Sequence, residues 1–315
     1  MPVSALFLAS LALAAQPESS PAPVEDDNPV PEAQRSESDG RIVVEAPPTA
    51  RERRRELRRM ARDVIRRPRA GRTVGSYFRA ICPKVFGIPD RPAKAIEDRM
   101  KSNAEELGVN RRDQSSNCRH NVSVIFVPPE KGPAEAWLTY ESDLLKHLLS
   151  FQRLRVINEK DPVRAWGHDV VRTSDGGQSQ DFVGRSISQA ADFGNRAFFA
   201  SRLLSATMVE IVGSVVMIEL ESAQGKTLHQ LADYASMRSF ANTAAIDPDT
   251  QPSAPTILTL FQDEDPPEEL TAFDRAFISM LYDTSRNALK SRFYGNIATR
   301  ALRMEQEDQA ASGGD

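Results

Sequence analysis

The sequence has no amino-terminal hydrophobic stretch long enough to anchor the chain in a membrane. The apolar run covers residues 5–15, whereas a membrane-spanning helix needs about 20 residues. Small residues end the run, which is typical of a signal-peptidase cleavage site, although no Lys or Arg precedes it. Gln16, not a cysteine, follows these residues, which argues against a lipid anchor. We therefore predict a signal peptide at residues 1–15 and a mature protein that is periplasmic or secreted.

Cysteine is scarce, with only Cys82 and Cys118 among 315 residues. An even pair in an oxidising compartment is expected to form a disulfide bond. A bridge that closes a loop of about 37 residues would stabilise the fold by roughly 3–4 kcal/mol. Two buried free thiols are the alternative, and neither cysteine lies in a motif typical of a catalytic thiol.

A glycine is missing where a nucleotide site would need one. Gly225-Lys226-Thr227 follows a strand-like stretch and opens a helix, which is the context of a phosphate-binding loop. Five positions earlier, however, Leu220 stands where that loop requires glycine. Without this glycine the backbone N–H groups cannot wrap a phosphate, so we reject a nucleotide site.

Histidine is also scarce, and the four histidines are scattered along the chain. His229 and Asp233 have the i, i+4 spacing of the two metal ligands on a zinc-protease helix. Gln230 replaces the glutamate that would activate water, and an amide cannot act as a base. We therefore expect no catalytic residue, metal or cofactor here, with His229 and Asp233 as the candidates for metal ligands.

The helix that carries this pair has an expected buried face. Four residues share that face: Leu228, Leu231, Ala232 and Ala235. His229 and Asp233 lie on its flank, where we expect a surface hydrogen bond with little effect on stability. No Gly-x-Ser-x-Gly motif occurs. A catalytic triad can still assemble from residues that are distant in sequence.

Charge is unevenly distributed, although the formal net charge is only −4. Residues 16–49 carry eight acids against two arginines and almost no large apolar side chains, so we predict a disordered acidic linker. Residues 50–72 carry eleven arginines against three acids. Apolar residues recur there at helical spacing: Leu57, Met60, Ala61, Val64 and Ile65.

The arginine-rich amphipathic helix at residues 50–72 admits two interpretations. Its arginines could bind an anionic membrane surface or another acidic polymer of the envelope. Alternatively, its apolar stripe packs on the body of the protein, and its arginines pair with acids of that body. The candidates for surface binding are Arg53, Arg54, Arg55, Arg58, Arg59, Arg62 and Arg66. Nucleic acid is a poor partner for an exported protein, and no protein partner can be named.

The pattern downstream predicts a single globular α+β domain at residues 81–304, with helices packed on a small sheet. Hydrophobic residues make up 40% of the chain, which is enough for a sizeable core. Strands are expected at residues 121–129 and 162–173, and residues 201–220 are expected to form either one buried strand or two with a bend at Gly213 between them. Helices are expected at residues 91–108, 133–151 and 268–282. Residues 305–315 are expected to form a disordered tail.

Several segments, in their order along the chain, resemble those of one family. They are ICPKVFGIP, CRHNVSVIFV, PVRAWG, SVVMIE, GKTLHQLADYASM, PTILTLF and LTAFDRAFISMLY. In these segments the chain resembles uncharacterised exported proteins of alphaproteobacteria, especially those of sphingomonads. The resemblance covers about residues 81–304 and includes the family's two-cysteine arrangement. It implies no activity.

A second similarity is to secreted domains distantly like zinc proteases, in which a strand also leads into a helix. Gln230 and Asp233 depart from the active pattern, so this similarity implies a protease-like shell without its metal. Two functional hypotheses follow. The first is a non-enzymatic envelope protein with a binding or structural role. The second is a zinc-protease-like hydrolase with a degenerate or unrecognised active site.

Overall fold

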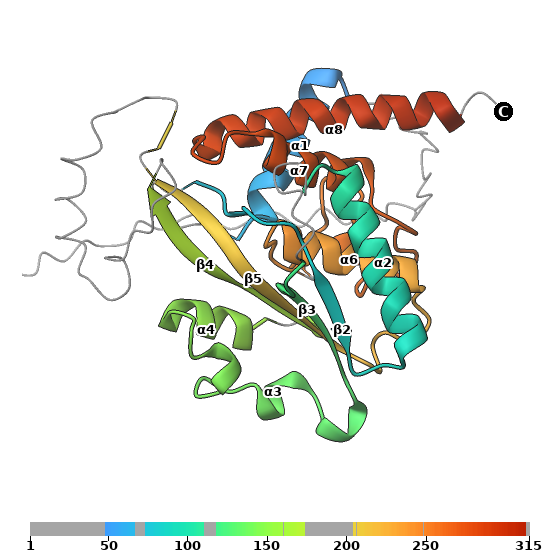
Figure 1. The fold of residues 1–315 in the computed structure, drawn as a ribbon. Coiled ribbons are helices and arrows are strands. Elements are labelled where there is room, and N and C mark those ends of the chain that lie inside the picture. Colours follow the sequence, from blue (N-terminus) through green and yellow to red (C-terminus); the bar gives the residue numbers. More distant parts are fainter. Residues whose placement is uncertain are drawn as a thin grey trace, which may run out of the picture. The chain divides into compact units, whose positions relative to one another are not determined.

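The sheet is organised around one long central strand, β5 (Thr207–Glu219). One edge of β5 pairs in parallel with β3 (Val122–Val127), which pairs in parallel with β2 (Pro83–Phe86). The opposite edge pairs with the antiparallel strand β4 (Val163–Thr173). The short strand β1 (Ser76–Tyr77) pairs in parallel with Glu210 and Ile211 of β5, whereas β3 pairs with the later residues 214–219. The computed structural model thus contains a mixed, mainly parallel sheet (Figure 1).

The described part of the chain comprises residues 48–66, 73–109, 118–159, 161–173, 204–205, 207–247 and 249–312. Its elements all belong to one compact unit, Pro47–Asp315. The predicted signal peptide and nearly all of the predicted acidic linker lie outside the described residues. No helix within these ranges is both long and apolar enough to span a bilayer.

Most of the helices pack on one face of the sheet. Helix α2 (Asp90–Glu106) connects β2 to the parallel β3 as a βαβ unit. Helix α6 (Leu228–Phe240) follows β5 and packs against α2. Helices α7 (Ala272–Asp283) and α8 (Lys290–Ser312) pack together, and α1 (Ala50–Asp63) lies against α8 (Figure 1).

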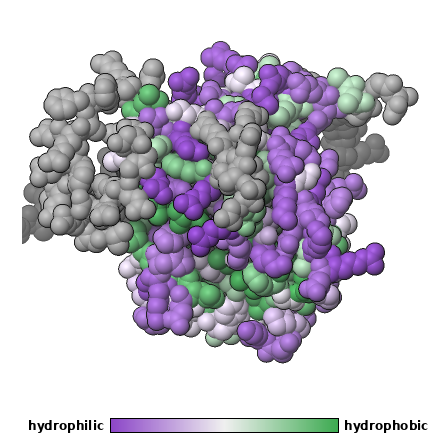
Figure 2. All heavy atoms as spheres, in the orientation of Figure 1, coloured by the Kyte–Doolittle hydropathy of each residue, from purple (hydrophilic) through white to green (hydrophobic). Residues whose placement is uncertain are grey.

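The two faces of the sheet build two hydrophobic cores, because successive strand residues point to opposite faces. Val124 of β3 and Ala165 of β4 join the larger core, together with residues of α1, α2, α6, α7 and α8. Val127 of β3 and Trp166 of β4 join the smaller core beside α3 (Ala134–Trp137) and α4 (Ser150–Ile157). Apolar atoms reach the surface in the lower part of Figure 2, where α3 and α4 lie. The exposed large hydrophobic residues between α3 and the end of α4 are Leu144, Leu149, Phe151 and Leu154.

The predicted α+β class is confirmed, and most expected elements are present. Strands β3 and β4 and helices α2 and α7 lie within a few residues of their expected bounds. Gly213, however, does not bend the chain, because β5 runs through it as one strand. The irregularity beside it is a shift of register between β4 and β5 at His168 and Asp169.

The single helix expected at residues 133–151 is wrong. This segment instead contains α3, the short 3-10 helix η2 (Asp143–Leu145) and the start of α4. The guanidinium of Arg153 donates hydrogen bonds to the carbonyls of Tyr140, Lys146 and Leu148. Those carbonyls would accept bonds from within a continuous helix, so Arg153 stabilises the broken conformation. Because the helix is broken, Leu144 and Leu149 are exposed.

Helix α1 is part of the globular unit, which therefore begins well before residue 81. The side chains of Leu57, Met60 and Ala61 are at most 2% exposed and belong to the larger core. A capping box between Thr49 and Glu52 begins the helix. The helix ends at Asp63, and Val64 and Ile65, which follow it, are also buried.

The disordered tail expected at residues 305–315 is wrong for residues 305–312, which belong to helix α8. Glu305 forms an ion pair with Arg53 of α1, with an N···O distance of 2.7 Å. Asp308 pairs with Arg275 of α7 at 2.6 Å. These ion pairs join the last turns of α8 to α1 and α7. Sequence periodicity could not identify these partners, because they are distant along the chain.

The predicted disulfide between Cys82 and Cys118 is confirmed, with a Cα–Cα distance of 5.6 Å. It links the residue before β2 to the segment that leads into β3. The side chain of Asn121 strengthens the same junction, because it accepts a hydrogen bond from the Cys82 amide and donates one to the Ala80 carbonyl.

Candidate functional site

Helix α6 carries His229 and Asp233, the two residues with the spacing of metal ligands, and it begins with a capping box. Thr227 accepts a hydrogen bond from the Gln230 amide, and the Gln230 side chain accepts one from the Thr227 amide. The amide nitrogen of the Gln230 side chain also donates to the carbonyl of Pro267. Gln230 therefore positions the start of α6, which explains the residue at this position without any catalytic role.

The expectation that Asp233 forms a surface pair with His229 is wrong. His229 is exposed, whereas the side chain of Asp233 is 0% exposed. Arg99 donates two hydrogen bonds to this carboxylate, each 2.9 Å long. Asn103 and the amide of Leu270 donate two more, at 2.7 and 3.0 Å. All four donors come from the protein itself, so the carboxylate has a structural role.

The helical wheel failed here because α6 is enclosed on every side. Every residue from Gln230 to Phe240 is buried, so the helix has no flank beyond its first turn. Leu231, Ala232 and Ala235 are buried as expected, but Leu228 is 38% exposed. Among the described residues, no group of three or more His, Cys, Asp or Glu side chains is placed to hold a metal ion.

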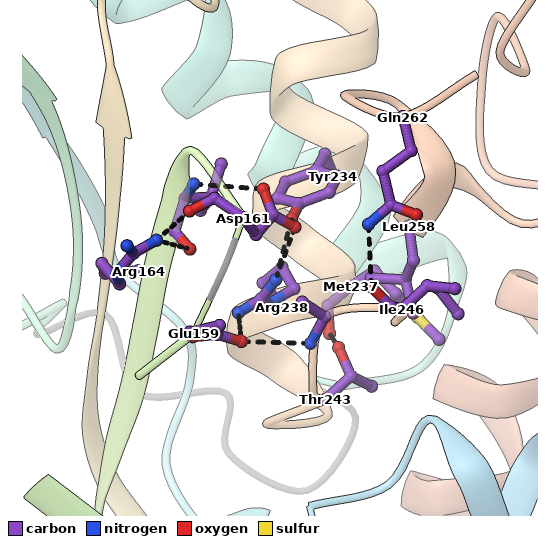
Figure 3. Close-up of polar contacts among 12 residues, drawn as sticks. Glu159, Asp161, Arg164, Tyr234, Met237, Arg238, Thr243, Ile246, Leu258 and Gln262 are labelled. Carbon is purple, nitrogen blue, oxygen red and sulfur yellow. Dashed lines mark hydrogen bonds and ion pairs between the residues drawn. The ribbon is translucent and has the colours of Figure 1, made fainter. Parts of the chain in front are cut away.

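A second buried charge network joins α6 to the connection between α4 and β4 (Figure 3). Arg238 is completely buried and donates to Glu159 at 2.7 Å and to the hydroxyl of Tyr234 at 2.8 Å. Tyr234 in turn donates to Asp161 at 3.1 Å. Arg66, which follows α1, reaches the other side of Glu159 at 3.2 Å. This network joins three distant parts of the chain.

The two carboxylates of this network have opposite pKa shifts. Burial by itself raises the pKa of both Glu159 and Asp161. Around Glu159, the charges of Arg238 and Arg66 outweigh burial, so its pKa is lowered. Asp161 faces Arg238 at a longer distance, 3.7 Å, and repels Glu159, so its pKa remains raised. Glu159 is therefore the firmly ionised partner of the two arginines.

Histidines that are scattered along the chain come together in space. Three of the four, His120, His147 and His168, line one pocket with a volume of about 290 Å³. The pocket lies on the face of the sheet that carries the smaller core, beside Trp166. We call it the histidine pocket. Its other lining residues are Asn121, Ser123, Trp166, Val212, Gly213, Ser214 and Val215.

Strand register brings the histidine pocket together. Val215 of β5 pairs with Ser123 of β3 on one side and with Trp166 of β4 on the other. Two residues before Val215, Gly213 pairs with His168 of β4. Because Gly213 has no side chain, it leaves the sheet surface hollow at this point. Alternation on β4 placed Trp166 and His168 on one face, but the sequence had no signal that His120 and His147 would join them.

Two pairs within the histidine pocket are close. The rings of His147 and His168 have centroids 5.0 Å apart. Burial, the nearby His168 and the charge of Arg153 all lower the pKa of His147. Across the pocket, Ser123 Oγ lies 2.9 Å from Nε2 of His120. The indole Nε1 of Trp166 is buried and has no hydrogen-bond partner among the described residues.

The arginines predicted to bind a surface fall into two groups. Arg53 and Arg66 are engaged within the protein: Arg53 pairs with Glu56 and Glu305, and Arg66 pairs with Glu159. The remaining five candidates are exposed, and we call them the arginine face: Arg54, Arg55, Arg58, Arg59 and Arg62. None of the five forms an ion pair with a described acid, although Arg62 lies over the ring of Tyr294 at 5.8 Å.

Comparison of the chain with family models, curated proteins and solved structures finds no match.

Proposed function

We propose that this is a non-enzymatic protein of the cell envelope that docks on anionic phospholipid surfaces through the arginine face. One observation carries the proposal: five arginines are exposed on one side of α1, while Leu57 and Met60 on its other side are in the core. A helix held in this way presents its charges at fixed positions. The free binding surface therefore needs no folding step when it meets a membrane.

The three acids of α1 offset the five charges of the arginine face only in part: Glu52 interacts electrostatically with Arg55, and Asp63, at the end of the helix, is exposed. Glu52 is used in the capping box with Thr49, and Glu56 pairs with Arg53. Each arginine held near an anionic leaflet contributes about 1 kcal/mol of attraction. Five such residues are enough for reversible binding that salt weakens, because exposed charges are screened beyond roughly 8 Å at physiological ionic strength.

The buried stripe of α1 decides the mode of binding. An amphipathic helix that inserts into a membrane uses its apolar face. Here that face packs in the core through Leu57, Met60 and Ala61, so it is not free to insert. We therefore propose peripheral, electrostatic docking. The disulfide and the lack of a spanning helix among the described residues are compatible with export, and we propose a periplasmic or secreted location.

The hydrolase alternative has less support. Its proposed ligands, His229 and Asp233, differ in environment, and the four donors around Asp233 leave it no free oxygen lone pair directed at a metal beside His229. Ser123 and His120 are within hydrogen-bond distance, but no described carboxylate bonds to the His120 ring to orient it. The arginine face requires no such missing group.

Vesicle sedimentation with the full mature chain tests the proposal. We expect binding to phosphatidylglycerol-containing vesicles, no binding to phosphatidylcholine vesicles, and a steep loss of binding as salt rises. A variant with all five residues of the arginine face changed to Gln should lose the binding. A matched control removes five exposed arginines elsewhere: Arg91, Arg119, Arg155, Arg292 and Arg303.

The control variant loses the same net charge, so it separates a local surface from a general effect of charge. Equal losses in the two variants would contradict the proposal. Binding to an acidic polysaccharide but not to vesicles would also overturn it, and would point to an envelope polymer instead. Thermal unfolding of both variants should match that of the wild type, because exposed arginines contribute little to stability.

A further inference from the structure

The histidine pocket offers hydrogen-bond donors and no opposite charge. None of its lining residues is an Asp or a Glu. Trp166 can only donate, and its buried Nε1 lacks a partner among the described residues. The residues that supply polar groups to the lining are the three histidines with Asn121, Ser123 and Ser214.

Among the described residues, the ionisable side chains that line the pocket are its three histidines. His168 from β4 and Arg153 from α4 act on His147, and His120 lies on the segment before β3. Lys146, beside His147, pairs with Asp143. Asp169 is the nearest acid on β4, and strand alternation places it on the opposite face from His168. A protonated histidine in this pocket therefore has no carboxylate partner among the described lining residues.

The walls of the pocket also have an apolar part. Trp166, Val212 and Val215 line it together with the polar groups. Val212 is 37% exposed, which is high for an apolar strand residue. A pocket with apolar walls and a few converging polar groups is the usual form of a site for small molecules.

We propose that the histidine pocket binds a small organic oxyanion, such as a carboxylate, beside the adjacent rings of His147 and His168. The apolar part of such a ligand lies against Trp166 and Val215. An anion fits better than a metal ion, because no described carboxylate lines the pocket and a protonated histidine ring only donates hydrogen bonds. This site is separate from the arginine face, so the proposal stands independently of membrane docking.

The binding has a defined pH dependence. Two adjacent imidazoles attract an anion only when at least one is protonated, so the affinity rises as pH falls through the histidine range. A metal ion behaves in the opposite way, because it binds the neutral imidazole and competes with protons. The direction of the pH effect therefore distinguishes the two kinds of ligand.

Proton NMR of the histidine rings in the full mature chain tests the proposal, with benzoate, acetate and inorganic phosphate as probes. With only four histidines, single His→Gln variants assign every ring signal. We expect benzoate to shift the signals of His147 and His168 and to leave that of His229 unchanged. Affinity should be about tenfold higher at about pH 5.5 than at about pH 8. Acetate should bind more weakly than benzoate, because it lacks the ring.

Two variants and one control complete the test. His147→Gln with His168→Gln should abolish the pH-dependent binding, while His229→Gln should not change it. Gly213→Val should block the pocket without removing a charge, and the histidine variants keep the test valid if that protein does not fold. Equal shifts at His229, absence of any shift, or zinc binding that strengthens as pH rises would each overturn the proposal. Binding of phosphate in preference to benzoate would support an anion site but overturn the contact of an apolar ligand part with Trp166 and Val215.

Discussion

Arg99 of α2 donates through both Nε and Nη2 to the carboxylate of Asp233 on α6, and each N···O distance is 2.9 Å. The amide of Leu270, which precedes α7, donates to the same carboxylate. One side chain therefore joins two helices and the start of a third. Helix α6 resembles the metal-binding helix of a zinc protease, but its Asp233 has this structural role instead.

Replacement of Asp233 by Ala should destabilise the fold by about 3 kcal/mol or more, because it leaves buried donors without acceptors. Replacement of His229 by Ala should change the free energy of unfolding by less than about 0.5 kcal/mol, as is usual at exposed positions. Urea denaturation of the two variants measures both values. Similar losses in the two proteins, especially if a chelator reproduces them, would show that a metal site exists on α6.

Two leucines of α6 provide a matched pair for the core. Leu231 is 4% exposed and Leu228 is 38% exposed. Leu231→Ala should cost about 2–5 kcal/mol through lost burial and a residual cavity. Leu228→Ala should cost under about 1 kcal/mol, since much of its side chain already meets water. Equal costs would contradict the packing of α6.

Acid should weaken the network around Glu159. Its pKa is lowered in the folded protein, so its contribution to stability is fully present above its unfolded pKa of about 4.3. The contribution is lost as pH falls through the lower folded value. At neutral pH, Glu159→Gln should cost about 3–5 kcal/mol, because Arg238 and Arg66 then lose their counter-ion. Unfolding measured between about pH 7 and 3 should show the difference from wild type shrinking; a constant difference would contradict this role.

Loss of the disulfide should lower stability without changing the fold. The double variant Cys82→Ser with Cys118→Ser should lose roughly 3–4 kcal/mol, because the unfolded chain regains the entropy of the open loop. Thermal unfolding under oxidising and reducing conditions measures the effect, and the double variant should be insensitive to reductant. Two thiols that react with an alkylating agent in the native protein would show that the bridge does not form.

The sequence predicted those features that depend on neighbours along the chain. Strand alternation in β3 and β4 was readable, and the two cysteines had only each other as partners. Features that depend on distant partners were not readable. Arg99 lies 134 residues before Asp233, so nothing local distinguished a buried carboxylate from a surface one. The helix expected at residues 133–151 had favourable periodicity, but Arg153 stabilises a different backbone by bonding to three carbonyls.

The histidine pocket shows the same limit at the level of the site. His120, His147 and His168 come from three separate segments, which meet because β3, β5 and β4 are adjacent in the sheet. That strand order is a property of the whole domain. The arginine face, by contrast, could be predicted from local sequence. Helical spacing alone placed Leu57 and Met60 on a different side of the helix from most of the arginines that are exposed.

The contact between α1 and α8 has a consequence for how the protein reaches its native state. Because Arg53 pairs with Glu305 and both helices contribute to the larger core, the earliest described helix needs the latest one as its packing partner. A chain that emerges with its amino terminus first cannot close this core until nearly all of it has appeared. Until then the stripe of Leu57, Met60 and Ala61 has no complete site in which to pack. Such a chain gains its final stability late, after its last helix has been made.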